Sequence, residues 1–390
     1  MQELTSLLTL NFISSMKKVA ICFGGYCPLH QGHMDVIMRA KKENDYCIVI
    51  VCGYNNEPRG WEINLNLEER YNLIHNFFKN DEQIFVDYIN DTKIGIDESM
   101  SDNNWRIWQK EVKHILGNAW IYPSEERKYE INWYVAEPYY KTCIERNNVL
   151  QEEYGEYANV NVILVEKANP VSGTQIRKNP VKYWNKITAP FKPYLCKNIL
   201  IIGTASEGKS TLVKDIARYF DIPYAEEYGR TYMEKHKKKD TDLTFDDFMA
   251  FLLGQTAECN EKRVNSKNGV FISDTDNTVT LMYAQAYVED EAINISQKGY
   301  DGLYLSAKSL QSIEKHKWDH IFIFPPSKDF VDDGCRYMKQ ASMDERKKNF
   351  MILQNLVNEF YPEVSKTYLN GTFLENFNEV KNYINSLIEG

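Results

Sequence analysis

Short, uninterrupted apolar runs alternate with helical patterns in the first half of the chain. Residues 19–23 and 46–52 are runs of the kind that parallel sheets bury on both faces, and residues 33–43 between them predict a helix. Weaker signals of the same two kinds predict strands at 84–86 and 160–165 and helices at 67–78 and 105–116. The strand–helix–strand order is typical of a doubly wound α/β domain with a parallel sheet.

A second series of the same kind begins after residue 197. Residues 198–202 predict a buried strand, which a glycine-rich turn joins to a helix at 210–220. The remaining predicted elements are strands at 269–274 and 320–324 and helices at 344–360 and 373–388. The pattern therefore predicts a second doubly wound α/β domain.

The stretch between the two series, residues 179–197, contains three prolines and little periodicity, which is typical of a linker. A length of 390 residues also fits two domains. The expected organisation is a flexible N-terminal extension at 1–16, a first domain at 17–185, a linker at 186–197 and a second domain at 198–390.

Composition agrees with a globular protein and narrows the range of partners. Hydrophobic residues make up 43% of the chain and charged residues 26%, so each half can bury a core. The net charge of -9 argues against sequence-independent binding to nucleic acid, which needs a basic surface, but it leaves room for a local anion site. The eight cysteines are dispersed without a C-x-x-C pair, and no apolar run is long enough to span a membrane. We therefore expect a cytoplasmic protein.

The first predicted strand is followed by the segment G-G-Y-C-P-L-H-Q-G-H at residues 24–33. Gly24 and Gly25 allow the backbone to approach a phosphate closely. His30 and His33 flank the start of the predicted helix, where backbone N–H groups favour an anion and imidazoles can donate hydrogen bonds to oxygens that gain charge. The alternative is that His33 only caps the helix and His30 packs in a turn.

A second segment, N-P-V-S-G-T-Q-I-R at residues 169–177, follows the strand predicted at 160–165. Ser172 and Thr174 can cap a helix and bond an anion, and Arg177 can bind a phosphate as a planar fork. Because the carboxyl ends of neighbouring parallel strands share one edge of the sheet, the two segments can converge there.

These two segments resemble the H-x-G-H nucleotidyltransferase family, whose Rossmann-like members transfer a nucleotidyl group from ATP to a phosphate and release pyrophosphate. The resemblance implies that the two histidines contact the phosphates of ATP and that the second segment holds its β- and γ-phosphates, with help from Lys17 or Lys18. The ATP-binding residues that it implies are Gly24, Gly25, Tyr26, His30, His33, Ser172, Thr174 and Arg177. Tyr26 stands where the family usually has phenylalanine.

The turn after the strand predicted at 198–202 reads G-T-A-S-E-G-K-S-T at residues 203–211, which contains the P-loop pattern. The backbone N–H groups of such a loop form an anion nest, Lys209 reaches the β- and γ-phosphates of ATP, and Ser210 coordinates Mg²⁺. The residues expected to bind ATP here are Gly203, Ser206, Glu207, Gly208, Lys209, Ser210 and Thr211. The alternative is a glycine-rich loop that matches by chance.

Charged residues after later elements supply further candidates. Asp274, at the end of a predicted strand, can be a direct or indirect partner of Mg²⁺, and either Asp274 or Asp276 could instead accept the proton of a substrate hydroxyl. The segment E-E-Y-G-R at 226–230 can grip a ribose and an aromatic cation, and Arg336 can offer a positive charge from a closing lid at 332–336. The alternative for Asp274 and Asp276 is an Asx turn that ends the strand. For residues 226–230 it is surface charge at a helix start, and for residues 332–336 it is an ordinary turn.

The order of the two motif sets resembles the NadR-type bifunctional family, in which a nicotinamide mononucleotide adenylyltransferase precedes a ribosylnicotinamide kinase. The phrases A-E-E-Y-G-R at 225–230, F-I-S-D-T-D at 271–276 and A-E-P-Y at 136–139 extend the resemblance, although Ala136 replaces a serine. It implies that the kinase half converts nicotinamide riboside to the mononucleotide with ATP. The other half then joins the mononucleotide to AMP from ATP, giving NAD and pyrophosphate.

The same resemblance implies the roles of residues. The catalytic residues would be His30, His33, Lys209 and Asp274, with Mg²⁺ held by Ser210 and Asp274. Nicotinamide riboside would contact Glu227, Tyr228, Arg230 and Asp276, and Arg336 would contact ATP in the kinase half. Mg²⁺ is the expected cofactor, and ATP is the co-substrate in both domains. Candidates to stack on the cationic pyridinium ring, each with a core position as the alternative, are Trp105, Trp108, Trp133 and Tyr139.

The short N-terminal segment bears on a further activity of some family members, which is binding to DNA. Only about 16 residues precede the first strand, fewer than the helix-turn-helix of some family members needs, so we do not expect DNA-binding repression. A different hypothesis is a nucleotide-binding sensor with weak catalysis that regulates a partner. The sequence leaves open the kinase base and whether the chain forms a homo-oligomer.

Overall fold

The structure is a computed structural model that describes residues 16–96, 101–166, 171–288, 290, 293, 295–330 and 341–389. It divides into two compact units. The first comprises Met1–Lys178 and Lys186–Phe191, and the second comprises Asn179–Asn185 and Lys192–Gly390. The chain therefore crosses between the units more than once within residues 179–191, and each unit includes part of this segment.

The sheet of the first unit has five parallel strands in the order β3-β2-β1-β4-β5. The strands are β1 (Lys17–Gly24), β2 (Tyr46–Gly53), β3 (Ile84–Asn90), β4 (Tyr129–Val135) and β5 (Ala158–Leu164). On one side of β1 lie β2 and then β3, and on its other side lie β4 and then β5. The loops at the carboxyl ends of β1 and β4 therefore diverge, which is where doubly wound sheets bind ligands.

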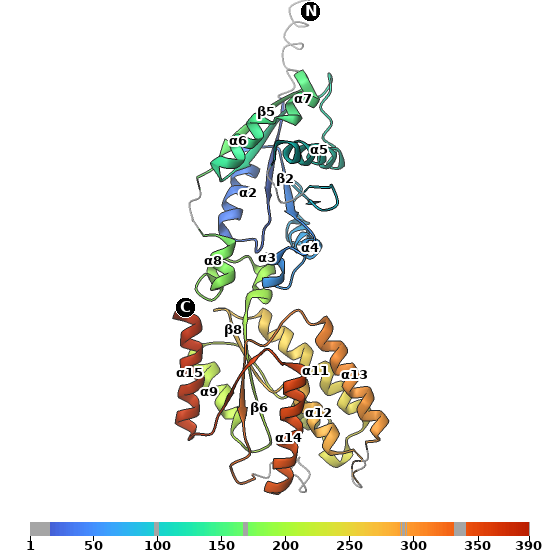
Figure 1. The fold of residues 1–390 in the computed structure, drawn as a ribbon, viewed down its shortest axis with the longest axis vertical. Helices are drawn as coiled ribbons and strands as arrows, with labels where there is room; N and C mark the ends of the chain where they lie inside the picture. Colours follow the sequence, from blue (N-terminus) through green and yellow to red (C-terminus); the bar gives the residue numbers. More distant parts are fainter. Residues whose placement is uncertain are drawn as a thin grey trace, which may run out of the picture. The chain divides into compact units, whose positions relative to one another are not determined.

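Helices cover both faces of this sheet, as the doubly wound prediction requires (Figure 1). They are α2 (Gln31–Glu43), α3 (Pro58–Glu62), α4 (Leu67–Phe78), α5 (Asp102–Asn118), α6 (Pro138–Arg146), α7 (Val149–Tyr154) and α8 (Gly173–Lys178). Val19 and Ile21 of β1 belong to the core formed with α5, α6 and α7. The residues that alternate with them, Ala20 and Cys22, are equally buried and point to the opposite face.

The second unit is also a five-stranded parallel sheet, in the order β10-β9-β6-β8-β7. Its strands are β6 (Lys197–Gly203), β7 (Tyr224–Ala225), β8 (Val270–Asp274), β9 (His320–Phe324) and β10 (Ser365–Tyr368). Its helices are α9 (Lys209–Phe220), α10 (Tyr228–His236), α11 (Phe245–Val264), α12 (Asn277–Ala286), α13 (Gln297–Ile313), α14 (Met343–Phe360) and α15 (Phe373–Glu389). Two doubly wound parallel-sheet units confirm the predicted fold class.

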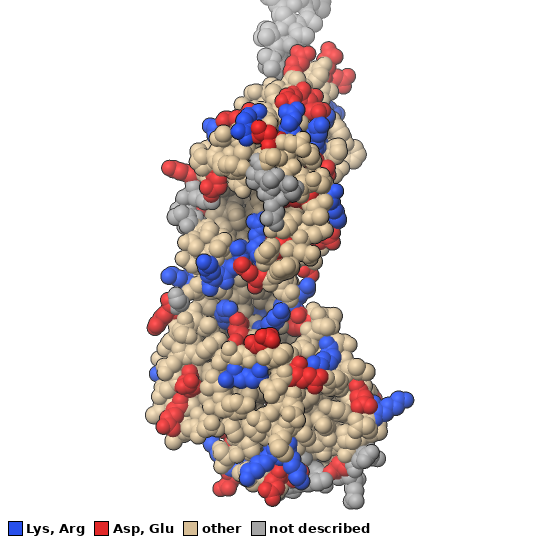
Figure 2. Space-filling view, viewed as in Figure 1, with Lys and Arg blue, Asp and Glu red and all other residues tan. Residues whose placement is uncertain are grey.

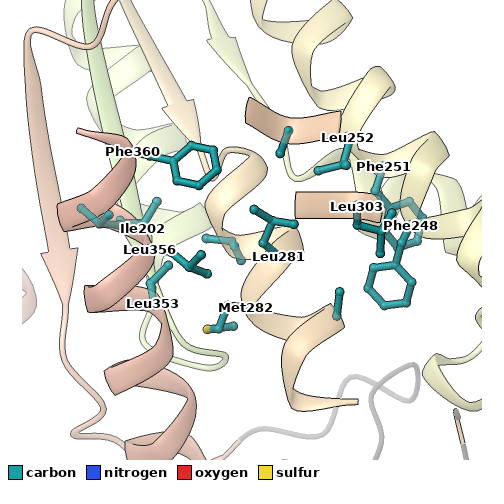
Figure 3. Packing of buried hydrophobic residues seen from close by; sticks show 14 of the residues in the cluster. Ile202, Phe248, Phe251, Leu252, Leu281, Met282, Leu303, Leu353, Leu356 and Phe360 are labelled. Atoms are coloured by element: carbon teal, nitrogen blue, oxygen red, sulfur yellow. The ribbon is translucent and has the colours of Figure 1, made fainter. Parts of the chain in front are cut away.

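The alternation of side chains along β6 separates two cores in the second unit. Leu200 and Ile202 pack with α11 to α14, whereas Ile199 and Ile201 pack with α9 and α15. Figure 1 shows these two groups of helices on opposite sides of the sheet. The larger core is drawn in Figure 3, where Leu281 meets side chains of α11, α13 and α14. Each fully buried leucine of this kind contributes about 1.5–3 kcal/mol to folding, so the strands are held rigidly beneath the loops.

The surface shown in Figure 2 carries basic and acidic side chains that are interspersed. Within the described part of the chain, no helix combines the length and the apolar character that crossing a bilayer requires.

Candidate active sites

The loop after β1 places both histidines at the start of α2. His30 is almost fully buried and is the N-cap residue of α2, because its Nδ1 accepts a hydrogen bond from the Gly32 N–H at 3.1 Å. The rings of His30 and His33 stack with their centroids 3.8 Å apart. Since Nδ1 of His30 is an acceptor, the ring proton lies on Nε2, which is the arrangement that a donor to a phosphate oxygen needs.

A buried ion pair supports the glycines of this loop. Arg70, which is 0% exposed, donates to the carbonyl oxygen of Gly25 and forms an ion pair with Glu57. Glu57 also pairs with Arg59, whose guanidinium lies so close to Gly25 that a Cβ there would approach it to 2.7 Å. The absence of a side chain at Gly25 therefore allows an arginine to lie directly against the loop. Sequence reasoning did not identify Glu57, Arg59 or Arg70.

The second segment lies against the first. Arg177 Nη1 donates to the Cys27 carbonyl oxygen at 2.6 Å, and a Cβ at Gly173 would lie 2.8 Å from the same oxygen. Ser172 and Gln175 cap α8 reciprocally through their side chains and backbone N–H groups. The geometry thus brings Thr174 and Arg177 to the H-x-G-H loop, although their contacts with ATP stay predictions.

The suggestion that Lys17 or Lys18 assists at this loop is wrong. Both lie at the amino end of β1, and a strand rises about 3.3 Å per residue, so they are far from Gly24 at its carboxyl end. Lys17 donates instead to the Tyr46 hydroxyl, and Lys18 pairs with Glu130.

A cavity of about 570 Å³ opens at the carboxyl ends of β1, β2 and β3, and we call it the Trp105 cavity. Its lining includes Gly24, Gly25, Arg59, Asp91, Asn104, Trp105, Trp108 and Tyr140. Of the four aromatic candidates, Trp105 and Trp108 line the cavity. Trp133 is fully buried in the core behind it, and Tyr139 is half-exposed and outside it. Tyr140 was missed.

Asp91 gives this cavity a titratable carboxylate. Burial raises the pKa of Asp91 to about 6, and the nearby Arg59 guanidinium opposes that shift. The Oδ1 atom of Asp91 is buried and has no hydrogen-bond partner among the described residues. A buried carboxylate beside tryptophan rings is the combination that a cationic aromatic ring favours. Asp91 directly follows β3, but the strand predicted from the sequence ended at residue 86, so the sequence did not single it out.

A second hollow, of about 730 Å³, lies at the carboxyl ends of β4 and β5. Glu137 and Pro138, from the A-E-P-Y phrase, line it together with Ser172. The H-x-G-H loop precedes α2, which packs against β1, β2 and β4, so the two hollows lie along one edge of the same sheet. This edge has room for two nucleotide moieties.

The P-loop of the second unit runs from β6 into α9. Gly203 has a φ of 152° and a Cβ there would lie 2.6 Å from the Phe324 carbonyl oxygen, so only glycine fits. Gly208 adopts a left-handed conformation as the N-cap residue of α9. Lys209 Nζ donates to the Thr204 carbonyl oxygen at 2.7 Å, so its ammonium group curls over the loop that it is expected to share with phosphates.

Several predicted kinase residues gather around Asp274 at the end of β8. Burial raises the pKa of Asp274, an effect that the positive charges of Lys209 and Arg230 and a hydrogen bond from Ser210 oppose and that Glu227 reinforces. Asp274 Oδ1 has no hydrogen-bond partner among the described residues. Hard oxygen ligands of this kind, a carboxylate and a hydroxyl beside a phosphate loop, suit Mg²⁺.

Glu207 has a different environment from the other P-loop residues. Its side chain is 0% exposed, pairs with Arg346 at the start of α14, and accepts hydrogen bonds from the backbone and hydroxyl of Ser327. Lys328 Nζ donates to the Glu207 carbonyl oxygen at 2.9 Å. The Glu207 carboxylate therefore holds the loop in shape, which leaves the backbone N–H of Glu207 as its part able to meet ATP. Arg346, Ser327 and Lys328 were not identified from the sequence.

The predicted acceptor residues are only partly brought together. A small cavity of about 40 Å³, the Glu227 cavity, is lined by Glu227, Phe251, Gln255, Thr275 and Tyr283 among others. The Tyr228 ring lies against Gly254 of α11, and its N–H donates to Gln255. Arg230 lies close enough to Asp274 to influence its pKa.

Asp276 does not line this cavity. Its Oδ1 caps α12 by accepting from the Thr278 N–H and hydroxyl, and its Oδ2 accepts from the Tyr361 hydroxyl at 2.5 Å. Both oxygens are thus engaged within the fold, and the contact predicted with nicotinamide riboside finds no support in this geometry. Thr211 is exposed on the first turn of α9. Arg336 and the proposed lid at 332–336 lie outside the described residues.

Two families match this chain, one in each unit. Residues 21–179 match the cytidylyltransferase-like family, and residues 198–368 match the AAA domain family. Phosphopantetheine adenylyltransferase of Fusobacterium nucleatum is 39% identical over 70 residues, which is 18% of this chain and 40% of that protein.

Longer relatives extend over both units. The trifunctional NAD biosynthesis/regulator protein NadR of Salmonella typhimurium is 26% identical over 381 residues, covering 93% of this chain and 81% of that protein. NadR of Escherichia coli is 26% identical over 374 residues, covering 91% of this chain and 80% of that protein. This chain is therefore similar to NadR along both of its units.

Solved NadR structures agree with this similarity. The structure of NadR in complex with NR superposes with a TM-score of 0.80 at 26% identity, covering 96% of this chain and 97% of that one. NadR in complex with NAD and AMP-PNP gives a TM-score of 0.79 at 25% identity over the same shares. The resemblance to NadR inferred from motif order is therefore confirmed across both units.

Proposed function

We propose that this chain makes NAD in two steps, as a ribosylnicotinamide kinase and a nicotinamide mononucleotide adenylyltransferase. The observation that carries the proposal is the presence of two separate phosphate-binding loops, each at the carboxyl edge of its own parallel sheet, in a chain that matches NadR along both units. Each unit has its own phosphate loop with candidate acceptor residues at the same edge of its sheet, so each unit can perform one transfer to a nicotinamide compound.

The kinase step takes place at the P-loop. Lys209 and the loop N–H groups bind the β- and γ-phosphates of ATP, while Ser210 and Asp274 would hold Mg²⁺, which neutralises phosphate charge when bound. The 5′-hydroxyl of nicotinamide riboside attacks the γ-phosphorus, and ADP leaves. This chain's contribution is to align the two reactants and to hold donors where negative charge develops.

Glu227 is the residue best placed to accept the hydroxyl proton. It lines the acceptor cavity, whereas Asp276 has both oxygens engaged and Asp274 faces Ser210 of the P-loop. A carboxylate beside the attacking hydroxyl typically contributes a factor of about 10² to 10⁴ in rate. Glu227→Gln should therefore lower the kinase rate by about 100-fold or more and leave adenylyl transfer unchanged in a steady-state assay of both products. Glu226→Gln is the matched control, since Glu226 pairs with Lys214 on the surface.

The adenylyl transfer takes place at the H-x-G-H loop. The mononucleotide occupies the Trp105 cavity, with Asp91 and the indole rings around its pyridinium ring and Arg59 as a positive charge for its phosphate. The phosphate oxygen attacks the α-phosphorus of ATP, and pyrophosphate leaves. His30 and His33 donate hydrogen bonds to the phosphate oxygens, and Arg177 holds the leaving group; no protein nucleophile is needed.

Two substitutions test the division of labour. Lys209→Ala should lower the rate of nicotinamide riboside phosphorylation, and His33→Ala should lower the rate of NAD synthesis from the mononucleotide. Each rate should fall at least about 100-fold, because a preorganised hydrogen-bond donor to a phosphate oxygen is lost. The other activity should stay within a factor of about two in each case, because the two loops lie in different units. The measurement is product formation from each substrate with ATP and Mg²⁺.

Matched controls lie on the same helix as Lys209 and in the same unit as His33. Lys214→Ala changes an exposed lysine on α9, and His114→Ala changes a histidine on α5 whose side chain is 72% exposed. Both should retain both activities. The two-site proposal fails if either Lys209→Ala or His33→Ala removes both activities from a folded protein, or if the unaltered chain forms neither product.

A further inference from the structure

The second unit contains another cavity that the two proposed reactions do not use. It has a volume of about 520 Å³, within the range of small-molecule sites, and we call it the Arg263 cavity. Its walls come from α11, the start of α12, the last turns of α13 and α14, and residues 314–318. No P-loop residue lines it, and it shares only Gln255 with the described lining of the Glu227 cavity.

Arg263 places a buried positive charge in this wall. The residue is 4% exposed, its Nε donates to Asn198 Oδ1 at 2.8 Å, and its Nη1 donates to Asn260 Oδ1. Among the described residues, no carboxylate forms an ion pair with it. Burial lowers the pKa of Arg263, yet a guanidinium remains charged in proteins. The guanidinium also lies over the Phe271 ring at 5.2 Å, and Glu314 and Asp319 act on it from a distance. Its hydrogen bonds, however, go only to neutral amides, and an anionic ligand in direct contact reduces the cost of burying the charge.

The carboxylates of the same wall are already engaged. Asp276 is bonded to Thr278 and Tyr361, and Glu314 accepts from the Asn260 amide and the His316 N–H. Burial lowers the pKa of His316 to about 3, so this ring is neutral near pH 7. The remaining charged lining residues are Lys308, Lys317 and Glu363. Lys308 pairs with Glu359 and Lys317 is exposed, so Arg263 is the buried cation of the described lining that an entering ligand can meet.

Aromatic side chains provide flat walls beside this charge. Trp318 stacks on the buried Phe271 with an interplanar angle of 17°, and Trp318, Phe360 and Tyr361 all line the cavity. The Oδ1 atom of Asn277, another lining residue, is buried and has no hydrogen-bond partner among the described residues. It can accept a hydrogen bond from a ring N–H or amino group. The wall thus offers aromatic faces, one acceptor and one cation.

We propose that the Arg263 cavity binds a small molecule that has a planar ring and an anionic group, with the ring against Trp318 and Tyr361 and the anion near Arg263. Carboxylates and phosphates share this chemistry, because the planar guanidinium can bind either group.

The contacts of the cavity link it to the kinase site. Gln255 lies between the two cavities and bonds to both Glu226 and Tyr228 through its side chain. One turn later on α11, Cys259 contacts the Ser273 hydroxyl, which donates to the Thr275 carbonyl oxygen beside Asp274. A ligand that moves α11 therefore moves the Glu227 cavity and the segment that carries Asp274. This regulatory consequence rests on the proposed kinase function, whereas the binding site does not.

Calorimetric titration of the full chain tests the site. Benzoate is compared with benzamide, a neutral molecule of the same shape, while AMP-PNP and Mg²⁺ saturate the phosphate loops. Phenyl phosphate forms a third arm that distinguishes a phosphate from a carboxylate ligand. We expect at least one anion to bind about tenfold more tightly than benzamide, because only an anion can form a charge-assisted hydrogen bond with Arg263. Equal binding of all three, or no binding, overturns the proposal.

Two variants assign any binding to this cavity. Arg263→Gln should abolish the preference for the anion, and Ser312→Trp should block binding by filling the cavity at an exposed position of α13 that no core contact depends on. Arg218→Gln, which changes an exposed arginine on α9, is the control. Unchanged anion binding in folded Ser312→Trp protein overturns the proposal even if Arg263→Gln fails to fold. A change of at least twofold in the KM for nicotinamide riboside with bound anion supports regulation, and an unchanged KM overturns that consequence alone.

Discussion

Asp91 shows how one side chain can make an activity depend on pH. Its pKa, raised to about 6 by burial, means that its carboxylate is mostly ionised at pH 7 and mostly neutral at pH 5. Only the ionised form attracts a pyridinium ring. The KM for nicotinamide mononucleotide should therefore rise several-fold as the pH falls from 7 to 5.

Asp91→Asn isolates this effect. The variant should have a high KM at pH 7 that changes little between pH 5 and 7, while the kinase KM follows the unaltered chain. The sign for stability is opposite. Because the folded state holds the Asp91 proton more tightly than the unfolded state does, this carboxyl weakens folding as the pH rises from about 4 to about 6. The variant should thus be more stable than the unaltered chain at pH 7 in urea denaturation, and a loss of stability would contradict this account.

Residues of the candidate sites differ in how far a sequence reveals them. His30, His33, Lys209 and Ser210 could be found because phosphate binding needs fixed residue types at fixed spacings before a helix. Asp276 has the right type and position along the chain, but Tyr361 engages it from 85 residues away. The role of Arg346 could not be recognised from the sequence either, because its partner Glu207 lies in a distant element. Such roles depend on tertiary neighbours that no local pattern encodes.

At the scale of elements, the links between helices and loops decide whether a phosphate loop keeps its shape. Arg70 in the first turn of α4 joins Glu57, the N-cap residue of α3, to Gly25 after β1. Arg70→Met should leave Glu57 as a buried carboxylate with a single partner and cost about 3–5 kcal/mol of stability in the first unit. Adenylyl transfer should fall sharply at a temperature where the kinase activity is retained.

The double variant with Glu57→Gln and Arg70→Met provides the control for this ion pair. Removing both charges should recover much of the stability lost in Arg70→Met, because no buried charge is left unpaired. Adenylyl transfer should remain low, since the Gly25 carbonyl still lacks its donor. Thermal inactivation of the two activities measures both effects. Full activity of Arg70→Met would show that the loop does not need this support.

Most strands of the two sheets were predictable because their apolar runs are continuous, but β4 was not. Its sequence, Y-E-I-N-W-Y-V, includes Glu130 and Asn132, which interrupt the apolar pattern. In the fold, the buried Asn132 donates to Asn44 and accepts from Asn161, so its polar groups are satisfied by residues 88 and 29 positions away. A polar residue inside a buried strand is thus explained only by partners that the sequence places far apart. The four-residue edge strand β10 was missed because it is short and half-exposed.

At the scale of the whole molecule, the segment between Lys178 and Lys192 contributes to both units. Trp184 is buried in the second unit, where its ring lies against Gly269 just before β8. Phe191 is fully buried and belongs to the first unit. Replacing either residue by alanine should cost about 3–5 kcal/mol, as for other buried aromatic side chains.

The two substitutions should affect different activities. Trp184→Ala should make the kinase activity the first to be lost on heating, and Phe191→Ala should do the same to adenylyl transfer. Residual activity of each kind after a heat pulse measures the order. Lys182→Ala, on the same segment but outside the core, should leave both inactivation curves unchanged. Parallel loss of both activities in either variant would mean that the units do not unfold separately.

Residues 179–191, which belong in turn to the second and the first unit, also constrain how the two units could be separated into two proteins. A break after Lys178 would leave residues 186–191 of the first unit attached to the kinase, and a break after Phe191 would carry Trp184 away from the kinase core. No single break yields two complete proteins. Two separately folding halves would therefore need compensating changes on both sides of the break.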